Sequence, residues 1–480
     1  MLVAAAAVAL RVYALTAKAL WFDETYSVFI ASLPIERLLV VTAINDAHPP
    51  LYYLLLHLWM PVFGDSELAV RLLSALIGAA VVPVVYLFGR HLVGPTAAVV
   101  AAGLVALVPA QIAVAQEARM YGLLSLTALL SWWALWAAAG GRRSWMAYVL
   151  AVAAMLYTHY YGFFVVASQG LYLVWVRAPL TTWKRWVASG FGVILLLIPW
   201  VPALLGQVLS GRAWPTFRPP LQPLLLLDTL LSLVVGRPVF DPLGVEVLPA
   251  AVAWALAVAA AVVLAAGAKA LADRRGSLAL VISASVLPIM LAFGVSYARH
   301  VFAPRYLSFA LPGVALLLAA GVIPRAVGRR WPRAAVVAVF AVVVATNVAS
   351  LARLYRLPRL DVFDWRAVSS VLASASRPDD VIAFLPGFAR IPVNYYFRGP
   401  QQRLALDPRV LDAEGPTGAR MGLLVTALVQ QPRVWIVTVP PVPPSVETLI
   451  AALGRRSYRV AARQEVNMAR LILLERGRRP

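Results

Sequence analysis

The fold is decided by long apolar stretches such as residues 68–89, which read LAVRLLSALIGAAVVPVVYLFG and contain a single charged side chain, that of Arg71. A helix needs about 20 apolar residues to cross a membrane hydrocarbon core of roughly 30 Å. Stretches of this kind follow one another through the first 356 residues. They lack the alternating pattern of a β-barrel strand, so we expect a bundle of membrane-spanning helices.

The composition agrees with a polytopic α-helical membrane protein and excludes an ordinary soluble domain. Of the 480 residues, 62% are hydrophobic and 13% are charged, and the mean hydropathy is +0.80. Cysteine is absent, which excludes disulfides, thiolate nucleophiles and cysteine metal sites. The first span can target the chain, and because apolar sequence begins directly at Met1, a longer native N-terminus is left open.

Eleven stretches before residue 357 are predicted to span the membrane. They cover residues 2–20, 68–89, 95–115, 119–139, 145–160, 162–177, 187–206, 247–268, 277–297, 306–324 and 334–352. Every second connection between them is basic, and the positive-inside rule places these five connections in the cytoplasm. Of the eleven acidic residues in this region, only Asp273 falls on the cytoplasmic side.

The charge distribution points to function on the extracytoplasmic side. Acidic residues contribute little to orientation, so their segregation is not a requirement of topology. The net charge of +21 comes mostly from basic residues in short connections between spans, where they indicate membrane orientation. It therefore does not indicate a nucleic-acid partner. We expect a multi-pass protein of the cell inner (plasma) membrane with a cytoplasmic N-terminus.

Two predicted outer connections, residues 21–67 and 207–246, are too long to be turns. In the first connection, the apolar stretches near 27–44 and 51–63 suit helices in the membrane interface. The second connection contains another apolar stretch, which follows Pro215, Pro219, Pro220 and Pro223. Both connections are expected to cover the outer side of a cavity that opens toward the lipid.

After residue 356 the sequence changes to a soluble α/β pattern. Strands are predicted at Val381–Leu385 and Val434–Val439, and helices at Asp364 onward and Ser445–Leu453. An odd number of spans places this domain, residues 357–480, outside. The membrane domain covers residues 1–356.

Two adjacent carboxylates, Asp23 and Glu24, stand directly after the first predicted span. Like charges this close raise the pKa of at least one carboxyl, which suits a general base. These two residues are the predicted catalytic pair. The alternative is an ordinary solvated start of a loop.

Other polar residues recur at the same predicted depth of the membrane. The candidates for substrate binding are Asp46, His48, Glu117, Arg119, Tyr121, His159, Tyr160, Tyr297, Arg299, His300, Arg305 and Tyr306. His48 could hydrogen-bond a phosphate or a catalytic carboxylate, and outward arginines such as Arg299 and Arg305 can bind a lipid phosphate bidentately. A structural turn, a salt bridge closing a hairpin, and nonspecific binding of lipid headgroups stay open as alternatives.

The sequence lacks the motifs of nucleotide-driven and zinc chemistry. It contains no P-loop, no His-Glu-x-x-His pattern and no dinucleotide fingerprint after a strand. ATP and NAD are therefore not indicated. We expect no required cofactor and no metal site, and leave a divalent cation open.

Four of these motifs, in this order, resemble the family 39 glycosyltransferases of the GT-C fold class, which include protein O-mannosyltransferases and aminoarabinose transferases. The motifs are Asp23-Glu24, His48-Pro49-Pro50-Leu51, Glu117-Ala118-Arg119-Met120-Tyr121 and Arg305-Tyr306. The resemblance covers roughly residues 1–352.

The resemblance implies transfer of a sugar from a polyprenyl-phosphate donor to a lipid, glycan or protein acceptor outside the membrane, with inversion at the anomeric carbon. Asp23 matches the family's catalytic base. A lipid-linked donor also agrees with the missing nucleotide motif. Neither the sugar nor the acceptor is indicated.

The second hypothesis is a transporter or flippase of lipid-linked glycans, in which the same charges would line a pathway. Transporters often place charges near the membrane midplane and carry internal repeats. Here the charges gather at one face and no repeat is visible, which favours the enzyme. The intact Asp23-Glu24 pair disfavours a scaffold that lost its activity.

Overall fold

A computed structural model of the chain describes residues 1–142, 144–210, 221–235, 250–323, 333–356, 363–404 and 418–477. The chain divides into two units. The first contains Met1–Leu15 and Ile30–Leu357, and the second contains Thr16–Phe29 and Pro358–Pro480. The segment that carries Asp23 and Glu24 therefore belongs to the second unit, whereas the sequence placed it in the membrane domain.

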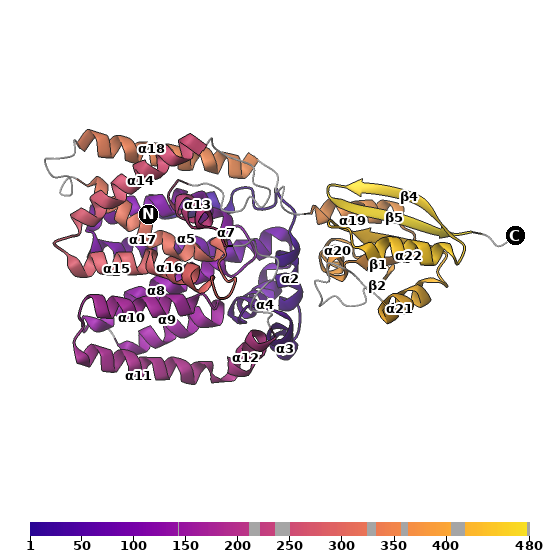
Figure 1. Cartoon of the computed structure of the whole chain (residues 1–480), viewed down its shortest axis with the longest axis horizontal. Helices are drawn as coiled ribbons and strands as arrows, with labels where there is room; N and C mark the ends of the chain where they lie inside the picture. Colours follow the sequence, from indigo (N-terminus) through magenta and orange to yellow (C-terminus); the bar gives the residue numbers. More distant parts are fainter. Residues whose placement is uncertain are drawn as a thin grey trace. The chain divides into compact units, whose positions relative to one another are not determined.

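The first unit is helical (Figure 1). Its early helices are α1 (Leu2–Val12), α3 (Ile35–Asn45), α4 (Leu51–Phe63), α5 (Glu67–Leu92), α6 (Pro95–Leu107), α7 (Pro109–Ala115), α8 (Tyr121–Ala139), α9 (Trp145–Thr158) and α10 (Gly162–Trp175). The later ones are α11 (Leu180–Leu197), η1 (Ile198–Trp200), α12 (Val201–Leu209), α13 (Pro223–Val235), α14 (Ala250–Ala270), α15 (Arg275–Ser285), α16 (Leu287–Val295), η2 (Pro304–Ala310), α17 (Leu311–Val322) and α18 (Arg333–Arg356). Helix α2 (Phe22–Ala31) begins in the second unit.

Each of the eleven predicted spans contains helix in the described residues, but in the first, residues 2–20, the helix ends at Val12. Among the residues that the structure describes, six helices are long and apolar enough to cross a membrane, or seven if the bent pair of α6 and α7 forms one span. The other four predicted spans fall on apolar helices that are shorter than this test requires, in α1, α9, α10 and the Val258–Ala270 part of α14. The count of eleven therefore stays a prediction for those four.

The predicted interface helices are also helical. The stretch 27–44 forms α2 and α3 with a break at Leu33-Pro34, and α4 covers residues 51–63. In the second long connection, Pro223 begins α13, whereas Pro215, Pro219 and Pro220 lie outside the described residues.

The break between α6 and α7 has a local cause. Pro109 has no N–H to donate to the carbonyl of Val105, and the helix axis bends by 59°. The buried guanidinium of Arg11 on α1 donates to the carbonyls of Val105 at 3.0 Å and Ala106 at 3.3 Å. Arg11 thereby satisfies acceptors that a helix end leaves without an internal partner, which explains a cation inside the helical core.

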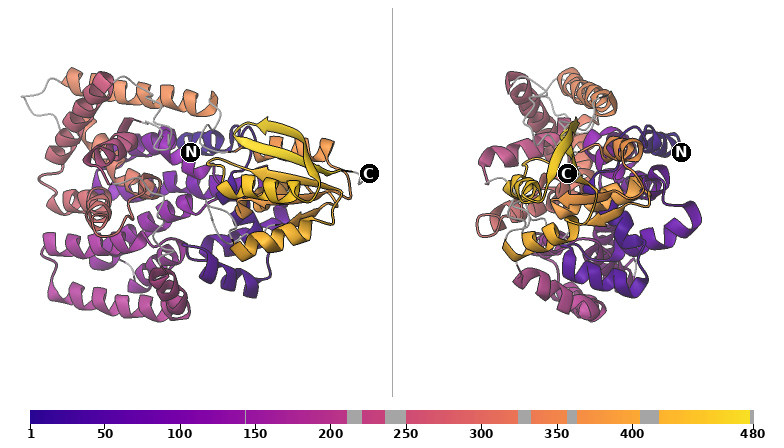
Figure 2. Two further views of the ribbon diagram at one scale, coloured as in Figure 1. Left: turned by 45° about the vertical axis from the view of Figure 1, so that its right-hand side comes forward. Right: turned by 90° about the vertical axis from the view of Figure 1, so that its right-hand side faces the viewer.

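Small residues allow close helix packing elsewhere in this unit. A Cβ added to Gly267 on α14 would lie 1.9 Å from the carbonyl oxygen of Leu317, and one added to Gly321 on α17 would lie 2.4 Å from that of Val263. Backbones that approach this closely gain van der Waals contact, which is a main driving force for helix association in lipid. Helices α9, α10 and α11 lie side by side in the same unit (Figures 1 and 2).

The second unit contains a five-stranded sheet with the order β2-β1-β3-β5-β4. Its elements after residue 362 are α19 (Trp365–Ala375), β1 (Val381–Leu385), η3 (Gly387–Ala389), α20 (Arg390–Tyr396), β2 (Gln402–Leu404), α21 (Gly418–Leu428), β3 (Arg433–Thr438), α22 (Pro444–Gly454), β4 (Tyr458–Val466) and β5 (Ala469–Arg476). Strand β1 pairs in parallel with β2 and β3, and β5 pairs antiparallel with β3 and β4.

Two apolar cores cover the two faces of this sheet. One joins α19 and α20 to side chains such as Phe384 and Trp435, and the other joins α21 and α22 to Leu385 and Ile436. Alternate residues of a strand face opposite sides, so a strand buried on both faces is apolar throughout, as Val381–Leu385 is. The predicted α/β domain is confirmed, and Figure 2 shows its sheet and helices in orange and yellow.

Candidate active site

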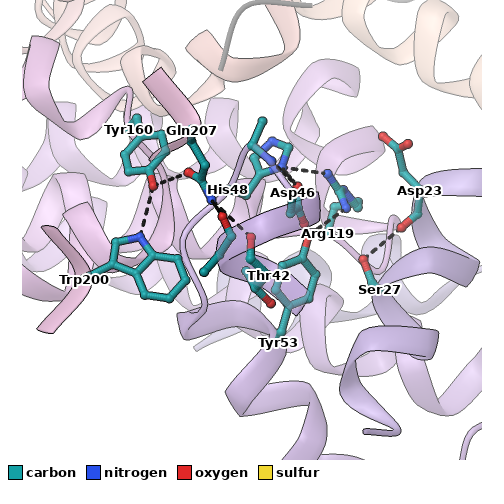
Figure 3. Close-up of polar contacts among 12 residues, drawn as sticks. Asp23, Ser27, Thr42, Asp46, His48, Tyr53, Arg119, Tyr160, Trp200 and Gln207 are labelled. Atoms are coloured by element: carbon teal, nitrogen blue, oxygen red, sulfur yellow. Dashed lines mark hydrogen bonds and ion pairs between the residues drawn. The ribbon is translucent and has the colours of Figure 1, made fainter. Parts of the chain in front are cut away.

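Four buried polar side chains meet where α3, α4 and the connection between α7 and α8 come together (Figure 3). We call Asp46, His48, Tyr53 and Arg119 the polar cluster. Asp46 Oδ1 lies 2.8 Å from His48 Nδ1, and Asp46 Oδ2 accepts the Tyr53 hydroxyl at 2.5 Å. Arg119 Nη1 donates to the Tyr53 hydroxyl at 3.2 Å. Chain segments more than sixty residues apart are thus joined by hydrogen bonds.

The local sequence builds the turn that carries Asp46 and His48. Asp46 ends α3 in an extended conformation, and its Oδ1 accepts the N–H of Ala47 at 2.6 Å. Pro49 and Pro50 have restricted backbone angles, and α4 begins directly after them. Tyr53 is then the third residue of α4, where its hydroxyl reaches the Asp46 carboxylate.

The Asp46 carboxylate is stabilised in its charged form. Burial raises its pKa, but the charge and hydrogen bond of His48, the charge of Arg119 and the hydrogen bond of Tyr53 together hold the pKa below its ordinary value. Asp46 is therefore an anion at neutral pH. It lies between an imidazole and a guanidinium, which offset the cost of burying it.

The hydrogen bond with Asp46 also fixes the tautomer of His48. A carboxylate only accepts, so Nδ1 of His48 carries the hydrogen that it shares with Asp46. Arg119 Nη2 lies 3.5 Å from the same Nδ1, and because both groups are donors we interpret this as a contact rather than a hydrogen bond. Nε2 has no hydrogen-bond partner within the described part of the chain. It presents a lone pair in the neutral ring and an N–H in the protonated ring.

Next to the polar cluster lie four rings that we call the aromatic cluster: Tyr121, His159, Tyr161 and Tyr306. The ring of Tyr306 stacks on Tyr121 at 5.5 Å and meets His159 at 4.6 Å and Tyr161 at 5.1 Å. The ring of His48 lies 5.2 Å from that of His159, which joins the two clusters. Aromatic walls with a few convergent polar groups are typical of ligand sites.

The hydroxyl of Tyr161 ties η2 to the aromatic cluster. It donates to the carbonyl of Val301 and accepts the N–H of Ala303 at 2.9 Å. These two backbone contacts precede η2, the element that carries Tyr306. The position of Tyr306 is therefore set by a side chain from the connection between α9 and α10.

Tyr160 has a different setting from its neighbour. Its hydroxyl donates to Gln207 Oε1 at 2.6 Å and accepts from Trp200 Nε1 at 3.0 Å (Figure 3). The amide of Gln207 donates to the carbonyls of Thr42 at 3.1 Å and Ala43 at 3.2 Å. This network supports the end of α3, just before Asp46.

Asp23 and Glu24 lie in the first turn of α2, within the second unit. Glu24 is buried, and its Oε2 accepts the N–H of Trp21 at 3.3 Å. Asp23 is half-buried, and its backbone carbonyl accepts the hydroxyl of Ser27 at 2.9 Å (Figure 3).

The remaining candidates differ in exposure. Glu117 is buried, and its carbonyl accepts the N–H of Arg119 at 2.7 Å in the turn before α8. Tyr297 is 72% exposed and packs on Phe293 at 5.6 Å. Arg299 and His300 are exposed, and Arg305 is half-buried directly before Tyr306 in η2.

The sequence interpretation missed Tyr53 and Tyr161. Tyr53 stands in the stretch after Pro50 and could have been found by helical spacing, although its neighbour Tyr52 bonds instead to Ser74 at 2.7 Å. No local pattern separates Tyr161 from Tyr160. Only the packing of η2 against the α9–α10 connection distinguishes them.

A metal site is not apparent in the described residues. Within them, no three His, Cys, Asp or Glu side chains are grouped so that they could hold a metal ion. The site chemistry described above consists of charged groups, imidazoles and phenols.

Comparison with known proteins gives a family match over part of the chain. Residues 47–203 match the family described as dolichyl-phosphate-mannose-protein mannosyltransferase. This segment contains His48, Arg119 and His159 but not Asp23 or Arg305. A comparison with curated proteins gives no match.

Solved structures match over nearly the whole chain. ArnT from Cupriavidus metallidurans in the apo state superimposes with a TM-score of 0.64 at 15% sequence identity, covering 98% of this chain and 97% of that one. The same protein bound to undecaprenyl phosphate gives 0.63 at 16% identity with the same coverage. The apo oligosaccharyltransferase from Archaeoglobus fulgidus gives 0.57 at 13% identity, covering 91% of this chain and 69% of that one.

These matches confirm the fold that the resemblance of the sequence motifs implied. The fold is that of the GT-C membrane enzymes, with a helical unit followed by a small α/β unit. Residues 47–203 are similar to the protein mannosyltransferase family, and the chain shares its fold with ArnT.

Proposed function

From this similarity to the GT-C membrane glycosyltransferases, we propose that the chain moves a sugar from a polyprenyl-phosphate donor to an acceptor on the extracytoplasmic side of the membrane, with inversion at the anomeric carbon. The acceptor is a lipid, a glycan or a protein. The ArnT structure bound to undecaprenyl phosphate supports a donor of this class.

The observation that carries the proposal is the polar cluster. A lipid-phosphate leaving group gains negative charge as the glycosidic bond breaks, and it needs fixed donors close by. The Arg119 guanidinium is held by Tyr53, and the His48 imidazole is held by Asp46 with Nε2 left for a ligand. Both are fixed before substrate arrives, so little reorganisation is needed during the reaction.

Arg305 is proposed as a further ligand of the donor phosphate, with Arg299 and His300 in support. Arg305 adjoins Tyr306, whose ring lies against those of His159 and His48. A guanidinium offers a planar pair of N–H donors that fits two phosphate oxygens. The aromatic cluster would then face the sugar or the first part of the lipid.

Asp23 is proposed as the general base. In a single displacement the acceptor oxygen attacks the anomeric carbon as the bond to the phosphate oxygen breaks, and the acceptor proton passes to the base. The proposal rests on the position of Asp23 shortly after the first predicted span, residues 2–20, and on its place in the first turn of α2. Glu24, which caps that turn, would position Asp23 rather than take the proton.

The test is an assay of the purified protein with a panel of polyprenyl-phosphate sugars, in which release of polyprenyl phosphate is measured. We expect release with at least one donor, and its loss in Arg119→Ala. The matched control is Arg185→Ala, because Arg185 is an exposed residue of α11. A transporter or flippase would move the donor between leaflets of a vesicle without releasing polyprenyl phosphate, and that result would overturn the proposal.

A further inference from the structure

The short segment Thr16–Phe29 is held by the α/β part of the second unit. The backbone N–H of Leu20 donates to the hydroxyl of Tyr396 at 2.6 Å. The ring of Phe22 packs edge-to-face on Phe388, with centroids 5.1 Å apart. Arg366 Nη2 donates to the carbonyl of Thr16 at 3.1 Å. Three contacts therefore fix the segment from its first residue to the start of α2.

The groups that hold the segment are themselves fixed. Tyr396 ends α20 and Phe388 lies in η3, and both pack against the apolar core that contains Trp365 and Val393. Tyr396 therefore keeps its ring against this core while its hydroxyl binds the Leu20 backbone. Side chains locked by core packing are good supports for a reactive group, because they have few other conformations.

The held residues set the start of α2. The N–H of Trp21 donates to Glu24 Oε2 at 3.3 Å, and the carbonyl of Trp21 accepts the N–H of Thr25 at 3.0 Å. A glutamate at the third helical position that accepts the N–H of the capping residue is one half of a capping box. Leu20 and Trp21 thus determine where the helix begins, and Asp23 is its second residue.

We propose that the α/β unit is a positioning module for the acidic pair, and that Tyr396 and Phe388 are positioning residues for sugar transfer. They act through Leu20, Trp21 and the first turn of α2 on the direction of the Asp23 carboxylate. This inference rests on the proposed function, in which Asp23 accepts the acceptor proton. It assigns a role in the reaction to a unit that holds none of the polar or aromatic cluster.

The experiment compares Tyr396→Phe and Phe388→Leu with the wild-type chain. Tyr396→Phe removes one hydroxyl and keeps the ring that packs on the core, so the unit should stay folded. Backbone hydrogen exchange of the segment Leu20–Phe29 is measured together with kcat and KM for the donor. The matched control is Tyr458→Phe, which removes a hydroxyl bonded to the carbonyl of Leu428 within the same unit.

We expect faster exchange at Leu20–Phe29 by about fivefold in Tyr396→Phe, the net effect of one hydrogen bond. kcat should fall by a similar factor, roughly fivefold, while KM for the donor stays within about twofold, since the donor phosphate is bound by other residues. Phe388→Leu should change both quantities in the same direction. Tyr458→Phe should leave the exchange of this segment and kcat at wild-type values.

Two results would overturn the inference, and a third concerns the proposed function. Unchanged exchange at Leu20–Phe29 in Tyr396→Phe would show that the hydroxyl does not hold the segment. Faster exchange with an unchanged kcat would show that the hydrogen bond from the segment to Tyr396 has no role in sugar transfer. A wild-type chain that exchanges slowly there but releases no polyprenyl phosphate from any donor would contradict the proposed function, and the positioning role with it.

Discussion

His48 Nδ1 lies 2.8 Å from Asp46 Oδ1 in a buried pair, and this one contact determines which atom His48 offers to a ligand. The carboxylate holds the hydrogen on Nδ1, so Nε2 is left for a phosphate or a hydroxyl. The same carboxylate also binds Tyr53, which in turn accepts from Arg119. Asp46 is therefore the centre through which the two candidate phosphate ligands are oriented.

The first prediction is that Asp46→Asn lowers turnover more than it lowers expression. Asparagine has nearly the same shape but no charge, and its amide can rotate and donate, which removes the fixed tautomer of His48. We expect kcat/KM for the donor to fall by roughly 10- to 100-fold, the effect of losing a charge-assisted hydrogen bond of about 1.5–3 kcal/mol. Steady-state release of polyprenyl phosphate measures this, with Asp228→Asn on α13 as a matched control. Wild-type kcat/KM in Asp46→Asn would remove Asp46 from this role.

The second prediction is a pH dependence of stability carried by Asp46. Its folded pKa is held below the ordinary value, mainly by His48 against the opposing effect of burial. A lowered folded pKa adds stability above the unfolded pKa of about 3.9, and this stability is lost as the pH falls through the folded pKa. Thermal unfolding of wild type and Asp46→Asn should therefore differ by a constant amount from pH 7 to about 5, and the difference should shrink below about pH 4. A difference that grows with acidity would contradict the sign.

The sequence predicted the helical unit and the α/β unit because both depend on local patterns. Apolar run length identifies a span, as in residues 68–89, and a wholly apolar strand between turns identifies β1. The sequence also predicted that His48, Arg119, His159 and Tyr306 belong to one site, since polar groups at the same predicted depth are expected to meet. In the structure these side chains lie close together. The prolines after His48 correctly indicated a fixed turn before α4.

That the segment with Asp23 groups with the second unit could not be read from the sequence. One of the contacts that hold its segment in the second unit joins Leu20 to Tyr396, which are 376 residues apart, through a single hydroxyl. Such a contact has no periodicity and leaves no local pattern. For the same reason, the sequence cannot show which of Tyr160 and Tyr161 belongs to the aromatic cluster. Their hydroxyls bond to Gln207 and Val301 respectively, far along the chain.

The third prediction concerns Arg305. Arg305→Lys keeps the positive charge but loses the planar pair of N–H donors, so the apparent donor affinity should fall by about 10-fold or more, within the 1.5–3 kcal/mol range of a charged hydrogen bond. Expression and thermal stability should be unchanged, since Arg305 is only half-buried. Arg185→Lys on the exposed surface of α11 is the control. Unchanged turnover in Arg305→Ala at limiting donor would exclude Arg305 from the site.

The fourth prediction is the orientation of the chain. The basic connections predict that the N-terminal end of α11, which contains Lys184, is cytoplasmic and that the α/β unit is extracytoplasmic. Since the chain has no cysteine, single cysteines can be placed at the exposed positions Lys184 and Arg456. A membrane-impermeant thiol reagent should label Arg456→Cys and not Lys184→Cys in cells whose outer barrier is removed. Labelling of Lys184→Cys alone would show that the orientation of the chain is opposite to the predicted one.

The fifth prediction separates the two adjacent carboxylates of α2. Glu24 accepts the N–H of Trp21 and thereby caps the helix, whereas Asp23 occupies the preceding position in the same turn. Asp23→Asn preserves shape but removes the basic oxygen, so kcat should fall by roughly 100-fold or more, the contribution of a general base. The affinity for the donor should change little, because the donor phosphate is bound by other residues.

Glu24→Gln keeps an oxygen that can accept the Trp21 N–H, so it should cost far less than Asp23→Asn. Glu24→Ala removes the cap and should lower kcat through misplacement of α2, with an accompanying loss of about 0.5–2 kcal/mol in the stability of that helix. The acidic limb of the pH profile of kcat should disappear in Asp23→Asn and persist in Glu24→Gln, since only the base must lose its proton for turnover. If Asp23→Asn is nearly normal and Glu24→Gln is inactive, the roles of the two carboxylates are reversed, and the capping contact of Glu24 must break before the reaction.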